Sequence, residues 1–133
     1  MIALRKTLLR EIIKNCEEER PCEGCGILAG KNGRVEKVYR MKNVEKTPVS
    51  YLMDSKEQLY VIKDIRNTGM EMLGIYHSHV SSPARPSRKD VDMAFYTDVS
   101  YVIVSFEAQQ PVVKSFKING ENVEEEVINI ENE

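Results

Sequence analysis

The sequence predicts an α/β protein in which helices cover a mixed sheet. Helical and strand-like periodicities alternate along the chain, one strand-like segment is apolar almost throughout, and two Asn-Gly pairs mark hairpin turns. The chain has 133 residues, the size of one ordinary domain, and no internal repeat or low-complexity linker. We therefore expect a single domain over residues 1–133.

The first part of the chain predicts a helix followed by a hairpin. Apolar residues recur every four positions from Leu4 to Cys16, which is typical of an amphipathic helix. Residues 25–30 and 34–44 are typical of strands. Asn32-Gly33 lies between them and predicts the turn, since both residue types tolerate a positive φ.

The middle of the chain predicts a second helix and a further strand. After a short extended piece at residues 51–54, Asp54 and Glu57 indicate a helix start, and Gly69 fits its end. Residues 71–79 are typical of a strand. A polar, proline-containing loop follows at residues 80–87.

The last part predicts a third helix and three strands. Ser87 opens the helix, and we expect Val91, Ala94 and Phe95 on its buried side. The strands are expected at residues 100–106, apolar enough for the centre of a sheet, at 111–118, and at 122–130 along an edge, with Asn119-Gly120 as a turn.

Charge and hydropathy argue against nucleic-acid and membrane binding. The net charge is −2, and the short cluster of Arg85, Arg88 and Lys89 is more typical of a solvated loop than of a basic binding surface. No apolar run reaches the roughly 18 residues of a membrane span. Charged residues interrupt the apolar N-terminal stretch, unlike the core of a signal peptide, so we expect a cytoplasmic protein.

Three cysteines, Cys16, Cys22 and Cys25, are an odd number, and we expect thiols rather than a disulfide framework. Cys22 and Cys25 form a CxxC pair, which can bind zinc or undergo redox cycling. A structural zinc would need two more ligands, and Cys16 is the only further thiol. We therefore disfavour a second metal site or a redox role.

The two histidines of the chain, His77 and His79, are the first sign of chemistry. Two positions apart on a strand, their side chains point to the same face, so both imidazoles can reach one ion. By itself an HxH pattern more often marks ordinary strand histidines. Asp90 follows after ten intervening residues, in the first turn of the third helix, and the loop is long enough to fold that helix start over the strand end.

These three residues make a catalytic metal site the stronger interpretation. Two imidazoles, one carboxylate and an open fourth position are the arrangement of catalytic zinc. Ser87 lies three residues before Asp90. The pair also fits a helix capping box, but metal binding would leave the Asp90 carboxylate less free for capping, and the Ser87 hydroxyl could then stabilise a developing oxyanion.

Together with Glu23, these residues resemble the JAMM (MPN+) metalloprotease signature: an upstream glutamate, H-S/T-H, seven residues, S, two residues, D. The segment from Pro21 to Leu28 is also similar to a stretch common in prokaryotic members. The resemblance covers most of the chain. It implies a three-layer α/β/α sandwich similar to cytidine deaminase, in agreement with the predicted element order.

The resemblance also implies roles for the residues. His77, His79 and Asp90 would hold one Zn²⁺, with water in the fourth position. Glu23 would act as general base and then general acid, and Ser87 would stabilise the tetrahedral intermediate. A water in this implied fourth position could attack the substrate at neutral pH, because zinc lowers the pKa of bound water to about 7.

Family members remove ubiquitin or ubiquitin-like proteins after a C-terminal Gly-Gly. The compact spacing of 53 residues between Glu23 and His77 resembles prokaryotic members that act on small ubiquitin-like sulfur-carrier proteins, releasing an amino acid such as cysteine or exposing the Gly-Gly end. The loop around Arg85 and Arg88 could meet a carboxylate or an acidic carrier.

Three alternatives remain open at this point: a non-catalytic MPN-like scaffold, a RadC-like DNA-repair-associated domain, and a nucleoside deaminase. The filled ligand positions argue against the first. The lack of a helical DNA-binding region argues against the second. The third would require a cysteine pair downstream of His-x-Glu, and the chain has no such order.

Overall fold

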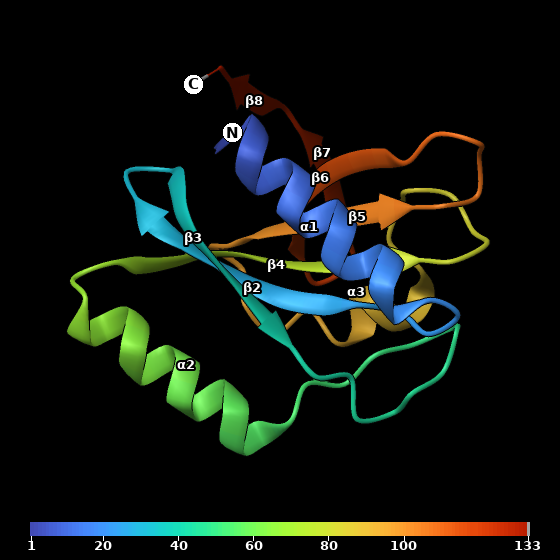
Figure 1. The fold of residues 1–133 in the computed structure, drawn as a ribbon, viewed down its shortest axis with the longest axis horizontal. Helices are drawn as coiled ribbons and strands as arrows, with labels where there is room; N and C mark the ends of the chain where they lie inside the picture. The colour runs from blue at the N-terminus through green and yellow to red at the C-terminus, as the bar shows by residue number, and fades with distance from the viewer. Residues whose placement is uncertain (133) are drawn as a thin grey trace.

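The computed structural model describes residues 1–132 (Figure 1). The elements, in chain order, are β1 (Ile2–Arg5), α1 (Lys6–Glu19), β2 (Cys25–Lys31), β3 (Arg34–Met41), α2 (Ser55–Asn67), β4 (Glu71–His79), α3 (Arg88–Asp92), β5 (Ser100–Ser105), β6 (Val112–Asn119), β7 (Asn122–Glu126) and β8 (Ile128–Glu131).

The strands form one eight-stranded sheet in the order β7-β6-β5-β4-β2-β3-β1-β8. β4 runs parallel to β5, and β1 runs parallel to both β3 and β8, whereas β2 pairs antiparallel with β3 and β4. The predicted mixed sheet is confirmed.

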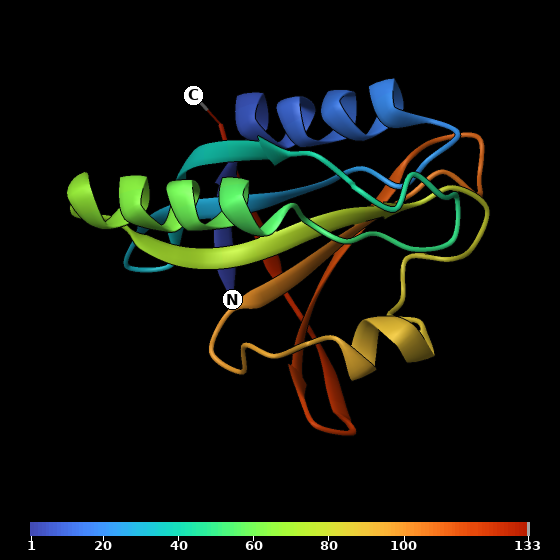
Figure 2. The same cartoon turned by 90° about the horizontal axis from the view of Figure 1, so that it is seen from below.

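Helices cover both faces of this sheet. Figure 2 shows α1 along one side and α3 on the other. Ile12 and Cys16 of α1 pack with Tyr76 in one core cluster, while Val61 and Ile65 of α2 belong to a second cluster on the opposite face. The three-layer α/β/α architecture is therefore confirmed.

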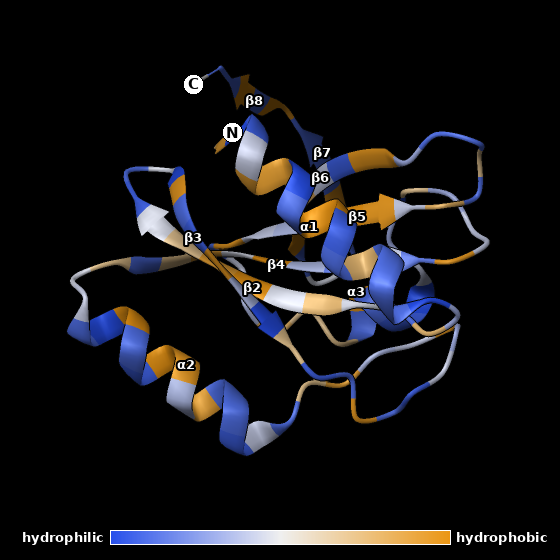
Figure 3. Cartoon of the chain, in the orientation of Figure 1, coloured by the Kyte–Doolittle hydropathy of each residue, from blue (hydrophilic) through white to orange (hydrophobic). Residues whose placement is uncertain are grey.

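Strand alternation divides the core between the two faces. In β5, Tyr101 and Ile103 belong to the α2 side, and Val102 and Val104 belong to the α1 side. β5 is buried along its whole length and is apolar over most of it, while α1 and α2 alternate polar and apolar residues (Figure 3). The central position predicted for this strand is correct.

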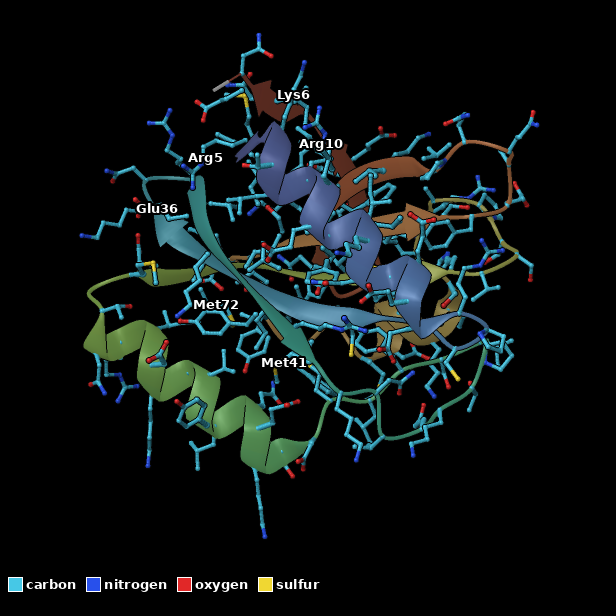
Figure 4. The ribbon with its side chains drawn as sticks, viewed as in Figure 1. Arg5, Lys6, Arg10, Glu36, Met41 and Met72 are labelled. Carbon is cyan, nitrogen blue, oxygen red and sulfur yellow. The ribbon has the colours of Figure 1, made fainter. Side chains whose placement is uncertain are left out.

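The space between α2 and the sheet is filled by flexible side chains as well as branched ones. Met41 and Met72 lie there, on the α2 side of the sheet (Figure 4). Arg5, Lys6 and Arg10 extend into solvent around the N-terminal end of α1.

Among residues 1–132, no helix is both long and apolar enough to cross a membrane.

Several predicted local signals are confirmed. The Asp54 side chain accepts a hydrogen bond from the Lys56 amide and caps α2. Gly69 follows the helix with φ +71°, a left-handed conformation that favours glycine. Asn32 and Gly33 both have positive φ in the β2–β3 turn.

Two expectations about the ends of helices are wrong. Residues 2–5 form a strand that was not expected, because the alternation of Ile2 and Leu4 runs straight into the helical pattern of α1. α3 has only five residues, so the chain turns away before Phe95 can pack. The Phe95 side chain is 75% exposed, whereas Val91 and Ala94 pack against the core as expected.

The predicted edge strand at 122–130 is two strands. β7 pairs with β6 and β8 pairs with β1, and only Val127 separates them. The Ile2 amide donates to the Val127 carbonyl at 3.3 Å. Residues 122–131 therefore form one bent stretch whose two halves, β7 and β8, are the two edge strands of the sheet.

Candidate active site

The candidate site lies where β4 ends beside the start of β2. His77 pairs with Cys25 in the antiparallel register of these strands, and continuing the register by two residues brings Glu23 across from His79. Ile75 packs on the α2 side of the sheet, so strand alternation turns His77 and His79 to that same face, where α3 begins. The fold thus brings all five predicted residues to one place.

Two imidazoles and a carboxylate converge at its centre. Asp90 Oδ2 lies 3.1 Å from His77 Nε2 and 2.9 Å from His79 Nε2. The two Nε2 atoms are 3.2 Å apart. His79 Nδ1 lies 2.8 Å from the Pro83 carbonyl oxygen, which fixes the ring and leaves Nε2 facing the cluster.

The cluster is held together electrostatically. Burial favours the neutral acid at Asp90, but hydrogen bonds from His77 and His79 outweigh it and hold the pKa of this carboxyl far below its usual range. Burial opposes a charge on His79, yet the hydrogen bonds to Asp90 and to the Pro83 carbonyl raise its pKa. The arrangement favours a positive charge among the three groups.

Asp90 also completes a capping box with Ser87. The Ser87 amide donates to Asp90 Oδ2 at 2.9 Å, and the Asp90 amide donates to Ser87 Oγ at 3.1 Å. One oxygen of Asp90 therefore faces both the histidines and the helix start. Ser87 Oγ accepts in this box and keeps its own proton for another acceptor.

Glu23 stands beside the cluster with an unused oxygen. The residue is 3% exposed, and its Oε1 has no hydrogen-bond partner in the described structure. Burial raises the pKa of Glu23 to about 7, against the opposing influence of His79. A carboxyl that titrates near neutrality can both accept and return a proton.

The donor set fits a metal. His77, His79 and Asp90 each offer one ligand atom, and these atoms lie within 4.8 Å of one another. Three acceptors crowded at this distance require a proton or a cation between them. The unpartnered Glu23 Oε1 is what a water-holding group beside a metal would show, since buried polar atoms are rarely left alone.

Two neighbouring side chains were not singled out in the sequence. The Tyr51 ring stacks on His77, with centroids 4.6 Å apart and planes at 25°. Ser78 points to the opposite face from the histidines, where its hydroxyl accepts from the Gly24 amide at 2.8 Å. Strand alternation could have indicated the direction of Ser78, but nothing local in the sequence links Tyr51 to His77.

A cavity of about 140 Å³ opens beside Asp90. Its walls are mainly apolar and aromatic, with Lys89 contributing a cation. They come from the 50–53 segment, from the start of α2, from β4 and β5, and from the chain around α3: Ser50, Tyr51, Leu52, Met53, Gln58, Ile75, Lys89, Asp90, Met93, Phe95, Tyr96 and Tyr101.

The three cysteines are free thiols, as expected. Cys25 is buried in the core, and Cys22 is half-buried.

In the predicted basic loop, Arg88 pairs with Glu121 and Lys89 pairs with Glu45. Within residues 1–132, Arg85 is the cation of this loop that forms no ion pair.

A His–His–Asp cluster at a strand end, beside a buried carboxyl that titrates near neutrality, defines a metal-dependent hydrolase. The model for prokaryotic homologues of the JAB domain matches residues 5–119. This chain belongs to that family.

Individual relatives support this family assignment. The CysO-cysteine peptidase of Mycobacterium tuberculosis is 35% identical over 133 residues, covering 98% of this chain and 91% of that protein. The desampylase of Pyrococcus furiosus is 36% identical over 97 residues, covering 73% and 69%. The chain is a hydrolase of the peptidase class.

Solved structures show the same fold. A solution structure of a protein from Desulfitobacterium hafniense has 40% identity and a TM-score of 0.90, covering 100% of this chain and 94% of that one. A structure described as a JAMM metalloprotease-like zinc site in the proteasome and signalosome has 18% identity and a TM-score of 0.64, covering 98% of each chain.

Proposed function

We propose that residues 1–133 form a single zinc peptidase domain that cleaves the bond after the C-terminal Gly-Gly of a small ubiquitin-like or sulfur-carrier protein. The bond is a peptide or an isopeptide. The observation that carries the proposal is the free, buried Glu23 carboxylate beside the His77–His79–Asp90 cluster.

In this proposal His77 Nε2, His79 Nε2 and Asp90 Oδ2 hold one zinc ion. Zinc supplies a Lewis acid that lowers the pKa of water and polarises a carbonyl. Glu23 Oε1 accepts a proton from the attacking water and delivers it to the leaving amine. Glu23 is buried beside the cluster and its Oε1 has no hydrogen-bond partner among the described residues, which leaves this oxygen free for both steps.

Ser87 acts on the developing negative charge. Its oxygen already accepts from the Asp90 amide, so its hydroxyl proton is available to the carbonyl oxygen of the scissile bond. A donor that is placed before the reaction begins stabilises an oxyanion without reorganisation.

The substrate class follows from the relatives and is supported by the shape of the site. A Gly-Gly tail has no side chains to read, so an extended backbone must be recognised by added strand pairing. The 50–53 segment borders the cavity beside Asp90, and its Met53 forms an antiparallel β-bridge with Asn43, so we expect this segment to pair with the tail. Arg85, which forms no ion pair among the described residues, is available to an acidic group of the carrier.

The three thiols fit a reducing compartment, and we propose the cytoplasm as the site of action.

The test is cleavage of small carriers ending in Gly-Gly, each fused to one amino acid or linked through a lysine side chain, with products weighed by mass spectrometry. We expect the zinc-loaded protein to release the carrier with a free Gly-Gly end. Glu23→Gln should keep zinc and lose turnover by at least about 10²-fold. Full activity of this variant would refute the role of Glu23, and no cleavage of any carrier by the wild type would refute the substrate class.

A further inference from the structure

Asn43, in the connection between β3 and α2, is a buried residue whose side-chain amide donates two hydrogen bonds and accepts two. It is 4% exposed. Its Nδ2 donates to the Glu23 carbonyl at 3.0 Å and to the Ser50 carbonyl at 3.1 Å. Its Oδ1 accepts from the Glu45 amide at 3.0 Å and from the Leu52 amide at 3.1 Å.

These four bonds join the Glu23 backbone to the loop that borders the site. The loop returns beside Asn43, where the Val44 amide donates to the Leu52 carbonyl at 2.9 Å. It is also tied to the Glu23 amide, which donates to the Thr47 carbonyl at 3.1 Å. Both backbone polar groups of Glu23 are therefore engaged with Asn43 or with the loop that Asn43 organises.

The same loop touches the other side of the cluster. Tyr51, one residue before Leu52, stacks on His77. Glu45 accepts from Lys89, the residue before Asp90, at 3.1 Å. Asn43 is thus one of two residues, with Thr47, that join the Glu23 backbone to the loop. This loop packs against His77 and reaches the start of α3.

The Glu23 side chain needs such support. Its Oε1 has no partner in the described structure, so the direction of the carboxylate depends on how firmly its backbone is held. A displacement of about 1 Å in a reacting group can reduce turnover by about 10²-fold. The Asn43 side chain supplies such support through its hydrogen bond to the Glu23 carbonyl.

We propose that Asn43 is a positioning residue that sets the place of the Glu23 carboxylate relative to the His77–His79–Asp90 cluster. It acts through the donor half of its amide, while the acceptor half shapes the loop. The inference rests on the role of Glu23 in the proposed function.

Asn43→Asp separates the two halves. The substituted side chain still accepts from the Glu45 and Leu52 amides, but it loses both donors and turns an oxygen toward the Glu23 and Ser50 carbonyls. We expect kcat to fall about 10- to 100-fold, with KM within about threefold of the wild type and zinc content unchanged. Asn67→Asp, the same chemical change at an exposed position on α2, should leave kcat unchanged.

Backbone hydrogen exchange provides a readout that does not depend on activity. In Asn43→Asp, peptides covering residues 20–28 and 43–54 should exchange faster than in the wild type, while a peptide covering β6 should be unchanged. Wild-type kcat in Asn43→Asp would overturn the proposal. Faster exchange throughout the chain would also overturn it, because Asn43 would then have only a general structural role.

The two proposals fail in different ways. A wild-type protein that cleaves no carrier refutes the proposed function, whereas exchange at residues 20–28 still decides whether Asn43 holds Glu23. A wild-type protein that cleaves, with Glu23→Gln inactive and Asn43→Asp fully active, refutes only the role of Asn43.

Discussion

His77 and His79 turn their Nε2 atoms toward each other at 3.2 Å. Two imidazole lone pairs at this distance would repel each other unless a proton or a cation lay between them, and the Asp90 oxygen that both rings share adds negative charge to the same small space. The arrangement is relieved by a cation at the centre, which gives the first prediction.

Asp90→Asn should lose the metal. An amide is a much weaker ligand than a carboxylate, so we expect zinc to fall from about one ion per chain to a small fraction of that, measured by atomic emission after desalting. His77→Ala should behave in the same way. Asp92→Asn, two residues along α3 and exposed, is the matched control and should retain its zinc. Equal zinc in Asp90→Asn and Asp92→Asn would contradict a site at this cluster.

Ser87 combines a helix cap with a proposed catalytic hydroxyl, and two substitutions separate them. Ser87→Ala should lower the free energy of unfolding by about 1 kcal/mol, because the cap is lost, and should lower kcat by about 10²-fold. Ser87→Asn can still cap the helix but has no hydroxyl, so we expect near wild-type stability and a similar loss of kcat. Thermal melts and steady-state kinetics check both. A fully active Ser87→Asn would show that the hydroxyl takes no part in the chemistry.

The cysteines should differ sharply in reactivity. Burial raises the pKa of the Cys16 and Cys25 thiols to about 12, so neither forms the reactive thiolate at neutral pH. Cys22 is half-buried. We expect one maleimide adduct per folded chain, located at Cys22 by peptide mass spectrometry, and three adducts after unfolding in denaturant. Modification of Cys16 in the folded protein would contradict this assignment.

Glu126 should make stability depend on pH in the acidic range. Burial opposes its charge, but hydrogen bonds to the N-terminal amine and to Ser100 and Ser115 outweigh that effect and lower its pKa. A lowered folded-state pKa contributes stability above the unfolded value of about 4.3, and that contribution disappears as pH falls through the folded value.

Glu126→Gln should therefore lower the free energy of unfolding by about 1–2 kcal/mol at pH 7, with the difference shrinking below about pH 4. Denaturant unfolding at both pH values measures it. Glu124→Gln, an exposed neighbour on β7, should show little effect at either pH. A difference for Glu126→Gln that grew on acidification would show that the sign is wrong.

The sequence predicted the layers and the site because both rest on local patterns. Alternation at His77 and His79, and a helix start at Ser87, are local properties that also fix where the side chains point. Glu23 was found only through resemblance, since an acid after a helix end has no distinctive local pattern. Its burial and its free oxygen appear only when the strands are assembled.

Other features could not be predicted because they depend on distant partners. Asn43 lies in a connection where asparagine usually indicates a turn. Its proposed role depends on a hydrogen bond to the carbonyl of Glu23, twenty residues away. The chain breaks into two strands at Val127 because β7 pairs with β6 and β8 pairs with β1. The solvent exposure of Phe95 follows from the early end of α3.

The bent stretch from β7 to β8 has a consequence for self-association. Each half has one neighbour in the sheet, so the open edges that remain are only five and four residues long. Short edges offer little template for a second sheet to grow on. A chain cut after Gly120 would uncover the eight residues of β6 and the whole of β1 together. We expect such a truncated chain to form insoluble fibrils or precipitates at concentrations where the intact one stays clear.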